Sequence, residues 1–217
     1  MLPTRTRIKV CGFTRPQDVI AAVEAGVDAV GFVFYPPSAR NVSFEQAAEL
    51  ASLLPPFVAA VGLFVDPQAE FVAEALRRVP LQWLQFHGDE SDARCAALSA
   101  IPGTDGRLPW IKAVRMRPGV DLLKFSAAHP GARGLLLDAF AEGYGGSGKT
   151  FDWSLIPPGV GHPLVLSGGL DPGNVGEAIR RLRPWAVDVS SGVEVAKGIK
   201  DAAKITAFVA GVRNADG

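Results

Sequence analysis

The feature that most constrains the fold of this chain is a repeated alternation between short apolar runs and segments with helical spacing. Eight strand-like runs lie at residues 7–11, 28–34, 58–65, 81–86, 109–114, 134–140, 163–168 and 186–191. Runs that are apolar almost throughout are typical of strands buried on both faces, as parallel sheets require. Eight such strands alternating with helices predict an α/β protein with a closed, eight-stranded parallel (β/α)8 architecture, the TIM barrel.

A doubly wound open sheet is the main structural alternative. Such a sheet usually has fewer strands, and a fingerprint such as G-x-G-x-x-G would follow its first strand, where this chain has CGFTRP. Two expected helix starts have capping-box spacing, Thr14 with Gln17 and Ser43 with Gln46. No linker or low-complexity segment divides the 217 residues, so we expect one (β/α)8 barrel domain over residues 1–217.

The charge composition excludes several classes of partner. Lys plus Arg and Asp plus Glu number 22 each, so no overall field attracts nucleic acid or an anionic membrane. The N-terminal segment lacks the apolar core of a signal peptide, and no stretch approaches the roughly 18 apolar residues of a membrane span. We therefore expect a cytoplasmic protein whose 2 cysteines, which form no C-x-x-C pair, are free thiols.

In a barrel of this kind, the reactive groups lie where strands end and the following loops begin. Cys11 ends the first apolar run, where it could be either a packed apolar side chain or a chemical group. Asp138 ends the run Leu135–Leu137 and is the stronger signal, because a lone buried carboxylate is costly unless it has a partner or a task. His87 and Asp188 also lie at strand ends, but structural roles are as plausible, and we leave both out of the catalytic set.

The last two strand ends are rich in glycine and serine. Gly168 and Gly169 follow the seventh run, and Ser190, Ser191 and Gly192 follow the eighth. Uncovered backbone N–H groups and short hydroxyls at these loops form the usual phosphate site of such barrels. Glycines that only make tight turns are the alternative, but two adjacent loops of this composition favour a phosphate cradle.

Two other kinds of site are disfavoured. Residues 143–150, GYGGSGKT, match the phosphate-binding pattern G-x-x-x-x-G-K-[ST], but the helix that must follow has no room before Pro157 and Pro158. We interpret this stretch as a glycine-rich loop over the site. Of the 3 histidines only His87 lies at a strand end, so we expect no metal site.

Several blocks of the chain resemble one enzyme family. KVCGFT, GFVFYPPSARNVS, LQFHGDE, GYGGSGKTFDW, LSGGLDPGNV, VDVSSGVE and GIKD are similar, in this order, to blocks of phosphoribosylanthranilate isomerase. The resemblance implies a metal-free and cofactor-free enzyme of tryptophan biosynthesis that performs an Amadori rearrangement on a small phosphorylated substrate. It implies that Cys11 is the general base, that Asp138 is the general acid and that Arg40 meets the anthranilate carboxylate.

Those roles set physical conditions. A free thiol has a pKa near ~8.5 and a carboxyl near ~4, so the site must lower the first pKa and raise the second. Electropositive neighbours favour a thiolate, and an apolar pocket, for which Phe34 and Phe86 are candidate walls, keeps a carboxyl protonated. Without the resemblance, Arg40 would be interpreted as a solvated loop residue.

Two alternatives to this reading stay open. One is the histidine-pathway aminoaldose isomerase, which performs the same rearrangement but resembles two half-barrel repeats and uses a carboxylate at the first strand end. The other is a barrel that binds a phosphosugar without turning it over, which would need the phosphate cradle but neither Cys11 nor Asp138. The sequence also leaves open whether the protein is a monomer or a homodimer.

Overall fold

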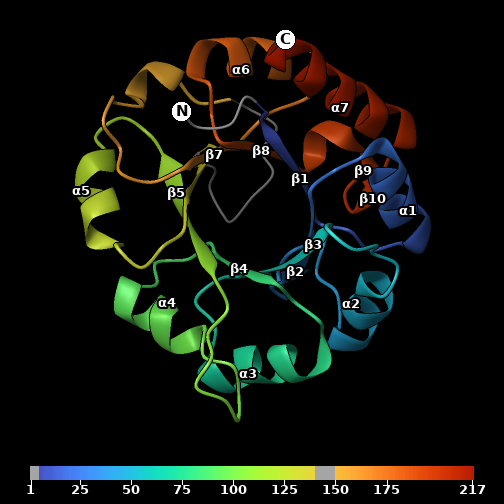
Figure 1. Cartoon of the computed structure of the whole chain (residues 1–217), viewed down its shortest axis with the longest axis vertical. Helices are drawn as coiled ribbons and strands as arrows, with labels where there is room; N and C mark the ends of the chain where they lie inside the picture. Colours follow the sequence, from blue (N-terminus) through green and yellow to red (C-terminus); the bar gives the residue numbers. More distant parts are fainter. Residues whose placement is uncertain (1–4, 140–149) are drawn as a thin grey trace.

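The computed structural model describes residues 5–139 and 150–217 of the chain. Its main feature is a closed parallel barrel in which neighbouring strands follow one another along the chain and β8 pairs with β1 (Figure 1). The strands are β1 (Arg7–Cys11), β2 (Ala29–Phe34), β3 (Ala59–Phe64), β4 (Trp83–Phe86), β5 (Trp110–Met116), β6 (Leu135–Ala139), β7 (Leu164–Leu166) and β8 (Ala186–Val189). The prediction of an eight-stranded (β/α)8 barrel is therefore confirmed, whereas the assignment of residues 1–217 to a single domain stays a prediction.

A ring of helices surrounds the barrel (Figure 1). It consists of α1 (Pro16–Ala25), α2 (Phe44–Ala51), α3 (Ala69–Arg78), α4 (Asp92–Leu98), α5 (Leu122–Ala128), α6 (Val175–Leu182) and α7 (Ala202–Asp216). Between β6 and β7 the described residues form only a short 3-10 turn, η1 (Trp153–Leu155), which ends before Pro157 and Pro158. Proline lacks the N–H that a helix interior needs, and the described part of this connection, residues 150–163, holds no α-helix.

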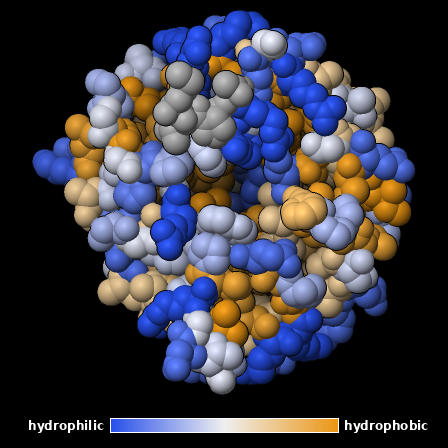
Figure 2. All heavy atoms as spheres, in the orientation of Figure 1, coloured by the Kyte–Doolittle hydropathy of each residue, from blue (hydrophilic) through white to orange (hydrophobic). Residues whose placement is uncertain are grey.

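Between β8 and α7 the chain inserts a small substructure. It consists of a 3-10 turn, η2 (Ser191–Val193), followed by the antiparallel pair β9 (Glu194–Ala196) and β10 (Ile199–Lys200). None of the helices in the described part of the chain has the length and hydropathy needed to span a membrane. On the face drawn in Figure 2, hydrophilic and hydrophobic residues are interspersed, in keeping with the balanced charge of the sequence.

The two expected capping boxes had different outcomes. Ser43 is the N-cap of α2, and its hydroxyl accepts a hydrogen bond from the Gln46 backbone N–H, as predicted. The Gln46 side chain donates to the Thr14 carbonyl instead of to Ser43, so only this half of the box forms. The expectation for Thr14 is wrong, because Arg15 is the N-cap of α1. The Thr14 hydroxyl instead donates to the Gly198 carbonyl at 2.6 Å, which ties the start of α1 to the β9–β10 hairpin.

The strands divide their side chains between the barrel interior and the helices. Phe34 of β2 and Phe64 of β3 point outward and stack with ring centroids 5.2 Å apart, and Phe86 of β4 continues this aromatic layer. Their neighbours Val33 and Leu63 pack inside the barrel with Cys11. Since successive side chains of a strand alternate between its faces, each outward phenylalanine is flanked by an inward residue. The interior positions carry the site.

Candidate active site

A pocket opens at the carboxyl ends of the barrel strands and encloses about 750 Å³, part of it open to solvent. Seven of the eight predicted site residues line it, namely Cys11, Arg40, Asp138, Gly168, Gly169, Ser190 and Ser191. The other lining residues are Val33, Tyr35, Ser38, Leu63, Val65, Gln85, His87, Ser167, Leu170, Asp188 and Val189. Segments far apart in the sequence thus meet around one pocket.

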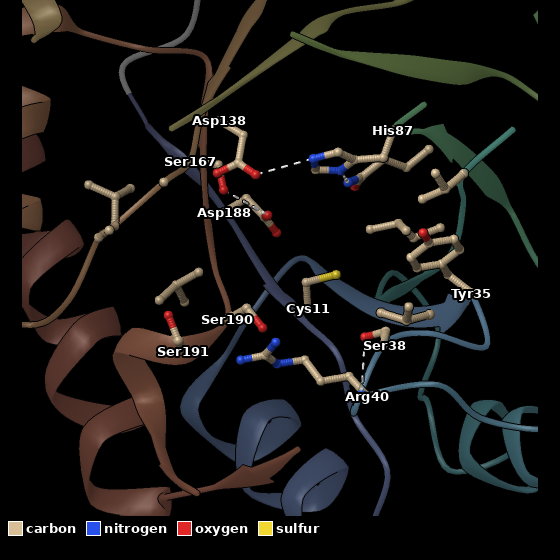
Figure 3. A pocket seen from close by; sticks show the side chains of 18 residues that line it. Cys11, Tyr35, Ser38, Arg40, His87, Asp138, Ser167, Asp188, Ser190 and Ser191 are labelled. Atoms are coloured by element: carbon tan, nitrogen blue, oxygen red, sulfur yellow. Dashed lines mark hydrogen bonds and ion pairs between the residues drawn. The ribbon is translucent and has the colours of Figure 1, made fainter. Parts of the chain in front are cut away.

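Cys11 is the last residue of β1 and is 5% exposed. It lies beside Gly31 of β2 in the register of the sheet, and its thiol extends into the pocket (Figure 3). Burial raises the pKa of the Cys11 thiol, while the positive charges of Lys9 and Lys200 oppose that rise. The expected electropositive neighbours are present, but burial outweighs them, so the expected lowering of the Cys11 pKa is not found in this structure.

Asp138, the penultimate residue of β6, is held by hydrogen bonds at both oxygens of its carboxyl group. Oδ1 accepts the backbone N–H of Ala139 at 2.9 Å, and Oδ2 lies 3.1 Å from Nε2 of His87 (Figure 3). The other ring nitrogen of His87, Nδ1, lies 3.0 Å from Nε2 of Gln85. With the Gln85 amide as donor, Nδ1 accepts, so Nε2 carries the ring proton and donates it to Asp138.

Arg40 reaches the pocket from the loop after β2, but one edge of its guanidinium is already in use. Its Nε and Nη2 donate to the two carboxylate oxygens of Glu194 at 2.8 and 2.7 Å. Within residues 5–139 and 150–217, Nη1 donates no hydrogen bond, so the Nη1–Nη2 edge of Arg40 can make a second bidentate contact, with a ligand carboxylate. The guanidinium group of Arg40 thus lies at the pocket as expected, and Glu194 holds it in a fixed orientation.

The predicted phosphate cradle lies on the opposite side of the pocket from His87 and Tyr35 (Figure 3). Gly168 and Gly169 have φ angles of 76° and 68°, in the left-handed region that glycine adopts without strain. A Cβ on Gly168 would lie 2.3 Å from the Ala139 nitrogen, so the β7 loop packs directly against the segment that carries Asp138. Ser190 and Ser191 bring the loop after β8 to the same place.

Gly192 differs from the other predicted phosphate residues, since it is not among the residues that line the pocket. A Cβ at this position would meet the Leu170 carbonyl oxygen at 1.9 Å, so the two loops touch through their backbones here. Its visible role in this structure is the close approach of the loop after β8 to the loop after β7.

The expectation that Phe34 and Phe86 wall the pocket is wrong. Both belong to the layer between the barrel and the helices, because they alternate with the inward residues Val33 and Gln85. The apolar part of the pocket is lined instead by Val33, Leu63, Val65, Leu170 and Val189. Residues 140–149, which include most of the glycine-rich stretch interpreted as a loop over the site, lie outside the described residues.

Sequence reasoning missed several buried polar residues that support the site. Gln85 was expected at the end of the fourth strand but was given no role, although it lies two positions before His87 and therefore on the same face of β4. Glu194 gave no signal, since its partner Arg40 is 154 residues away. Within residues 5–139 and 150–217, no group of three or more His, Cys, Asp or Glu side chains is arranged to hold a metal ion.

Comparisons with known proteins agree with one another. The family model described as N-(5'phosphoribosyl)anthranilate (PRA) isomerase matches residues 8–211. A protein of this name from Dechloromonas aromatica is 58% identical over 212 residues, covering 98% of each chain. One from Leptothrix cholodnii is 57% identical over 214 residues, covering 99% of this chain and 94% of its own.

Solved structures described as phosphoribosyl anthranilate isomerase are also similar to this chain in fold. The structure from Thermotoga maritima superimposes with a TM-score of 0.86 at 43% identity, covering 96% of this chain and 99% of that one. A structure described as the enzyme in complex with reduced 1-(o-carboxyphenylamino)-1-deoxyribulose 5-phosphate has a TM-score of 0.83 at 40% identity, with the same coverage. On sequence and fold together, the chain belongs to the N-(5'-phosphoribosyl)anthranilate isomerase family.

Proposed function

We propose that this pocket isomerises N-(5'-phosphoribosyl)anthranilate to 1-(2-carboxyphenylamino)-1-deoxyribulose 5-phosphate, with Asp138 as general acid and Cys11 as general base. The observation that carries the proposal is that a carboxyl group from β6 and a thiol from β1 face one pocket beside two glycine- and serine-rich loops. A barrel that only bound a phosphosugar would need the loops but not this pair. The reaction is that of the family to which the chain belongs.

The first step opens the sugar ring. Asp138 transfers its proton to the ring oxygen as the bond between that oxygen and C1 breaks, and the lone pair of the anthranilate nitrogen forms a C1=N bond. The resulting carboxylate of Asp138 is stabilised by the donors already in place, the Ala139 N–H and the His87 ring. Because these donors are fixed before the reaction, they need no reorganisation when the negative charge appears.

The second step moves a proton away from C2. The Cys11 thiolate accepts the C2 proton, the C–H electron pair forms a C1=C2 bond, and the electrons of the C1=N bond return to nitrogen. The enol that results takes up a proton at C1 from the Cys11 thiol, and its C2 hydroxyl gives a proton to the Asp138 carboxylate as the C2=O bond forms, which returns both groups to their starting states. Electrons and atoms balance without an oxidant, a reductant or a co-reactant, so the sequence of steps requires no cofactor.

Three groups orient the substrate in this proposal. The free edge of Arg40 receives the anthranilate carboxylate, and the loops with Gly168, Gly169, Ser190, Ser191 and Gly192 hold the phosphate. The complex of the 40% identical relative with a phosphorylated carboxyphenylamino compound supports a ligand of this class. Gly192 contributes by shaping the cradle, since it packs against Leu170.

The wider setting of the reaction is part of the same proposal. The ligand is a small phosphorylated molecule, with no nucleic acid or membrane partner and no metal, and the protein acts in the cytoplasm as a monomer or homodimer. One solved structure, 39% identical to this chain, is described as monomers generated from a dimeric enzyme, which supports the homodimer. Size-exclusion chromatography with light scattering decides between the two states.

The test follows the loss of substrate fluorescence with freshly generated N-(5'-phosphoribosyl)anthranilate. Turnover by the wild-type protein should fall by about 10²- to 10⁴-fold in Cys11→Ser and in Asp138→Asn, while binding of a phosphorylated product analogue is retained. A wild-type protein that binds the analogue tightly but shows no turnover would refute the isomerase proposal in favour of a binding protein.

A further inference from the structure

Two buried lysines next to Cys11 have no role in the reaction steps above. The side chain of Lys9 is 7% exposed and that of Lys200 is 0% exposed. A buried ammonium group costs several kcal/mol of desolvation, which an ion pair only partly offsets, so ion pairing alone is a weak reason to keep one. Both lie close enough to the Cys11 thiol to lower its pKa, which points to an electrostatic role.

Lys9 approaches Cys11 along β1. It lies two residues before Cys11, so both side chains are on the same face of the strand and inside the barrel. Its Nζ donates to Oδ1 of Asp188 on the neighbouring strand β8 at 2.6 Å, and Oδ2 of Asp188 accepts the Ser167 hydroxyl at 3.1 Å. The ammonium group is therefore held in one position beneath the pocket.

Lys200 approaches the same residue from β10. Its Nζ lies 2.6 Å from the carbonyl oxygen of Cys11, 3.1 Å from that of Ser190 and 2.9 Å from Oε1 of Glu194. Glu194 is shared with Arg40, which it binds through both carboxylate oxygens. A single carboxylate thus serves two cations.

The charges in this cluster do not cancel. Three cations, Lys9, Lys200 and Arg40, face two carboxylates, Asp188 and Glu194, which leaves one positive charge in excess around the thiol. The other titratable groups that line the pocket are Tyr35, His87 and Asp138. A thiolate at Cys11 would neutralise the excess, because it adds the one negative charge that the cluster lacks.

We propose that Lys9 and Lys200 are positioning residues that supply the counter-charge for a Cys11 thiolate. The inference rests on the proposed function, in which Cys11 acts as the base, and it assigns the origin of the basicity to two residues that act through the Cys11 thiol. A neutral thiol removes a C–H proton far less well than a thiolate, so these lysines set the pH range in which the enzyme works.

The electrostatics of the site agree with this geometry. Burial raises the pKa of Cys11, the charges of Lys9 and Lys200 lower it, and the charge of Asp188 raises it. The pKa of Lys9 itself is raised despite its burial, with Asp188 and Cys11 favouring the charged form, whereas burial lowers the pKa of Lys200. The charged form of Lys9 is therefore favoured more strongly than the charged form of Lys200.

The test titrates the thiolate directly, by its ultraviolet absorbance, as the difference between each protein and the same protein carrying Cys11→Ser. The other cysteine does not interfere, because burial raises the pKa of Cys95 to about 12. Two variants remove the counter-charges. Lys200→Met leaves Glu194 paired with Arg40, and Lys9→Met combined with Asp188→Asn removes a whole ion pair rather than leaving one charge unpaired.

A matched control removes another buried pair from the same barrel. Lys112 and Glu90, whose side chains are each 2% exposed, interact at 2.9 Å, and Lys112 acts on the Cys95 thiol rather than on Cys11. We expect the Cys11 midpoint to rise by about 1 to 3 pH units in Lys200→Met. The rise should be smaller in Lys9→Met with Asp188→Asn, because the loss of the Asp188 charge lowers the thiol pKa and offsets part of the loss of Lys9. In Lys112→Met with Glu90→Gln, the Cys11 midpoint should stay at the wild-type value.

The result that overturns the inference is a Cys11 midpoint that stays unchanged in both counter-charge variants, or one that moves equally in the control. The acid limb of the kcat/KM profile should move with the midpoint, since it reports the same proton. Because the titration needs no substrate, it can fail while the isomerase activity stands, and it can succeed in a protein that only binds. The two proposals are thereby tested separately.

Discussion

Gly31→Ala is the sharpest test of the Cys11 position that the structure offers. Gly31 lies beside Cys11 in the register of β1 and β2, and its carbonyl accepts the backbone N–H groups of Gly12 and Phe13. A Cβ on Gly31 would stand 2.6 Å from the Cys11 sulfur and 3.1 Å from its Cα. Ordinary contacts begin at about 3.5 Å, so the thiol must move by about 1 Å or turn to another rotamer.

The size of the effect follows from that displacement. A misplacement of about 1 Å at a reacting group costs on the order of 10²-fold in rate, which corresponds to about 2.7 kcal/mol in the barrier. The fold should lose less, about 1–3 kcal/mol for one added methyl group in a packed region. For a chain of this size, each kcal/mol lowers Tm by about 2–4 °C, so the variant stays folded at assay temperature.

Gly62→Ala on the neighbouring strand β3 is the matched control. Its Cβ would meet Leu81 Cδ1 at 2.7 Å and Phe64 Cε2 at 3.0 Å, which is a clash of the same severity against core side chains only. We expect both variants to lose similar stability in thermal unfolding and only Gly31→Ala to lose kcat/KM by about 10²-fold. Equal activity losses in the two variants would mean that the thiol position is not what Gly31 protects.

Two further predictions concern Arg40 and Cys95. Arg40→Lys cannot bind Glu194 and a ligand carboxylate through two separate edges, so we expect KM to rise by about 10- to 100-fold with a smaller change in kcat, measured by steady-state kinetics. An unchanged KM would remove Arg40 from the binding site. Burial raises the pKa of Cys95 from 9.0 to about 12, so the unfolded state releases this proton first and stability falls as the pH rises from 9 towards 12. Urea unfolding between pH 8 and 11 should show a smaller decline in Cys95→Ala than in wild type, and parallel curves would contradict the assignment.

The local pattern of the sequence was enough to predict the barrel and the residues at its rim. Each apolar run became a strand, and the rule that parallel strands end on one face brought Cys11, Asp138 and the glycines of the β7 loop to one pocket. The capping box at Thr14 failed because its hydroxyl found a tertiary partner, the Gly198 carbonyl. Local propensity competes with contacts of this kind, and a single sequence does not reveal them.

The errors inside the pocket have a different origin. Along a strand the side-chain period is two, so a shift of one residue exchanges the interior for the exterior. Phe34 and Phe86 were expected inside the barrel and lie outside it. In β2 both faces are apolar, so the hydrophobic pattern does not distinguish them, whereas in β4 the inward position is held by the polar Gln85. Only the closure of the barrel fixes which of two neighbouring residues in a strand points inward.

The sequence by itself determined the order of strands and helices, the end of the barrel where the site lies, and the thiol and carboxyl that the proposed chemistry uses. The tertiary structure alone decided how those groups are supported: Glu194 against Arg40, His87 against Asp138, and Lys9 and Lys200 around Cys11. Secondary structure follows from interactions between near neighbours in the chain, which a sequence displays directly. The charge environment of a buried group depends on residues such as Asp188 and Lys9, 179 positions apart, which only the folded barrel brings within 2.6 Å.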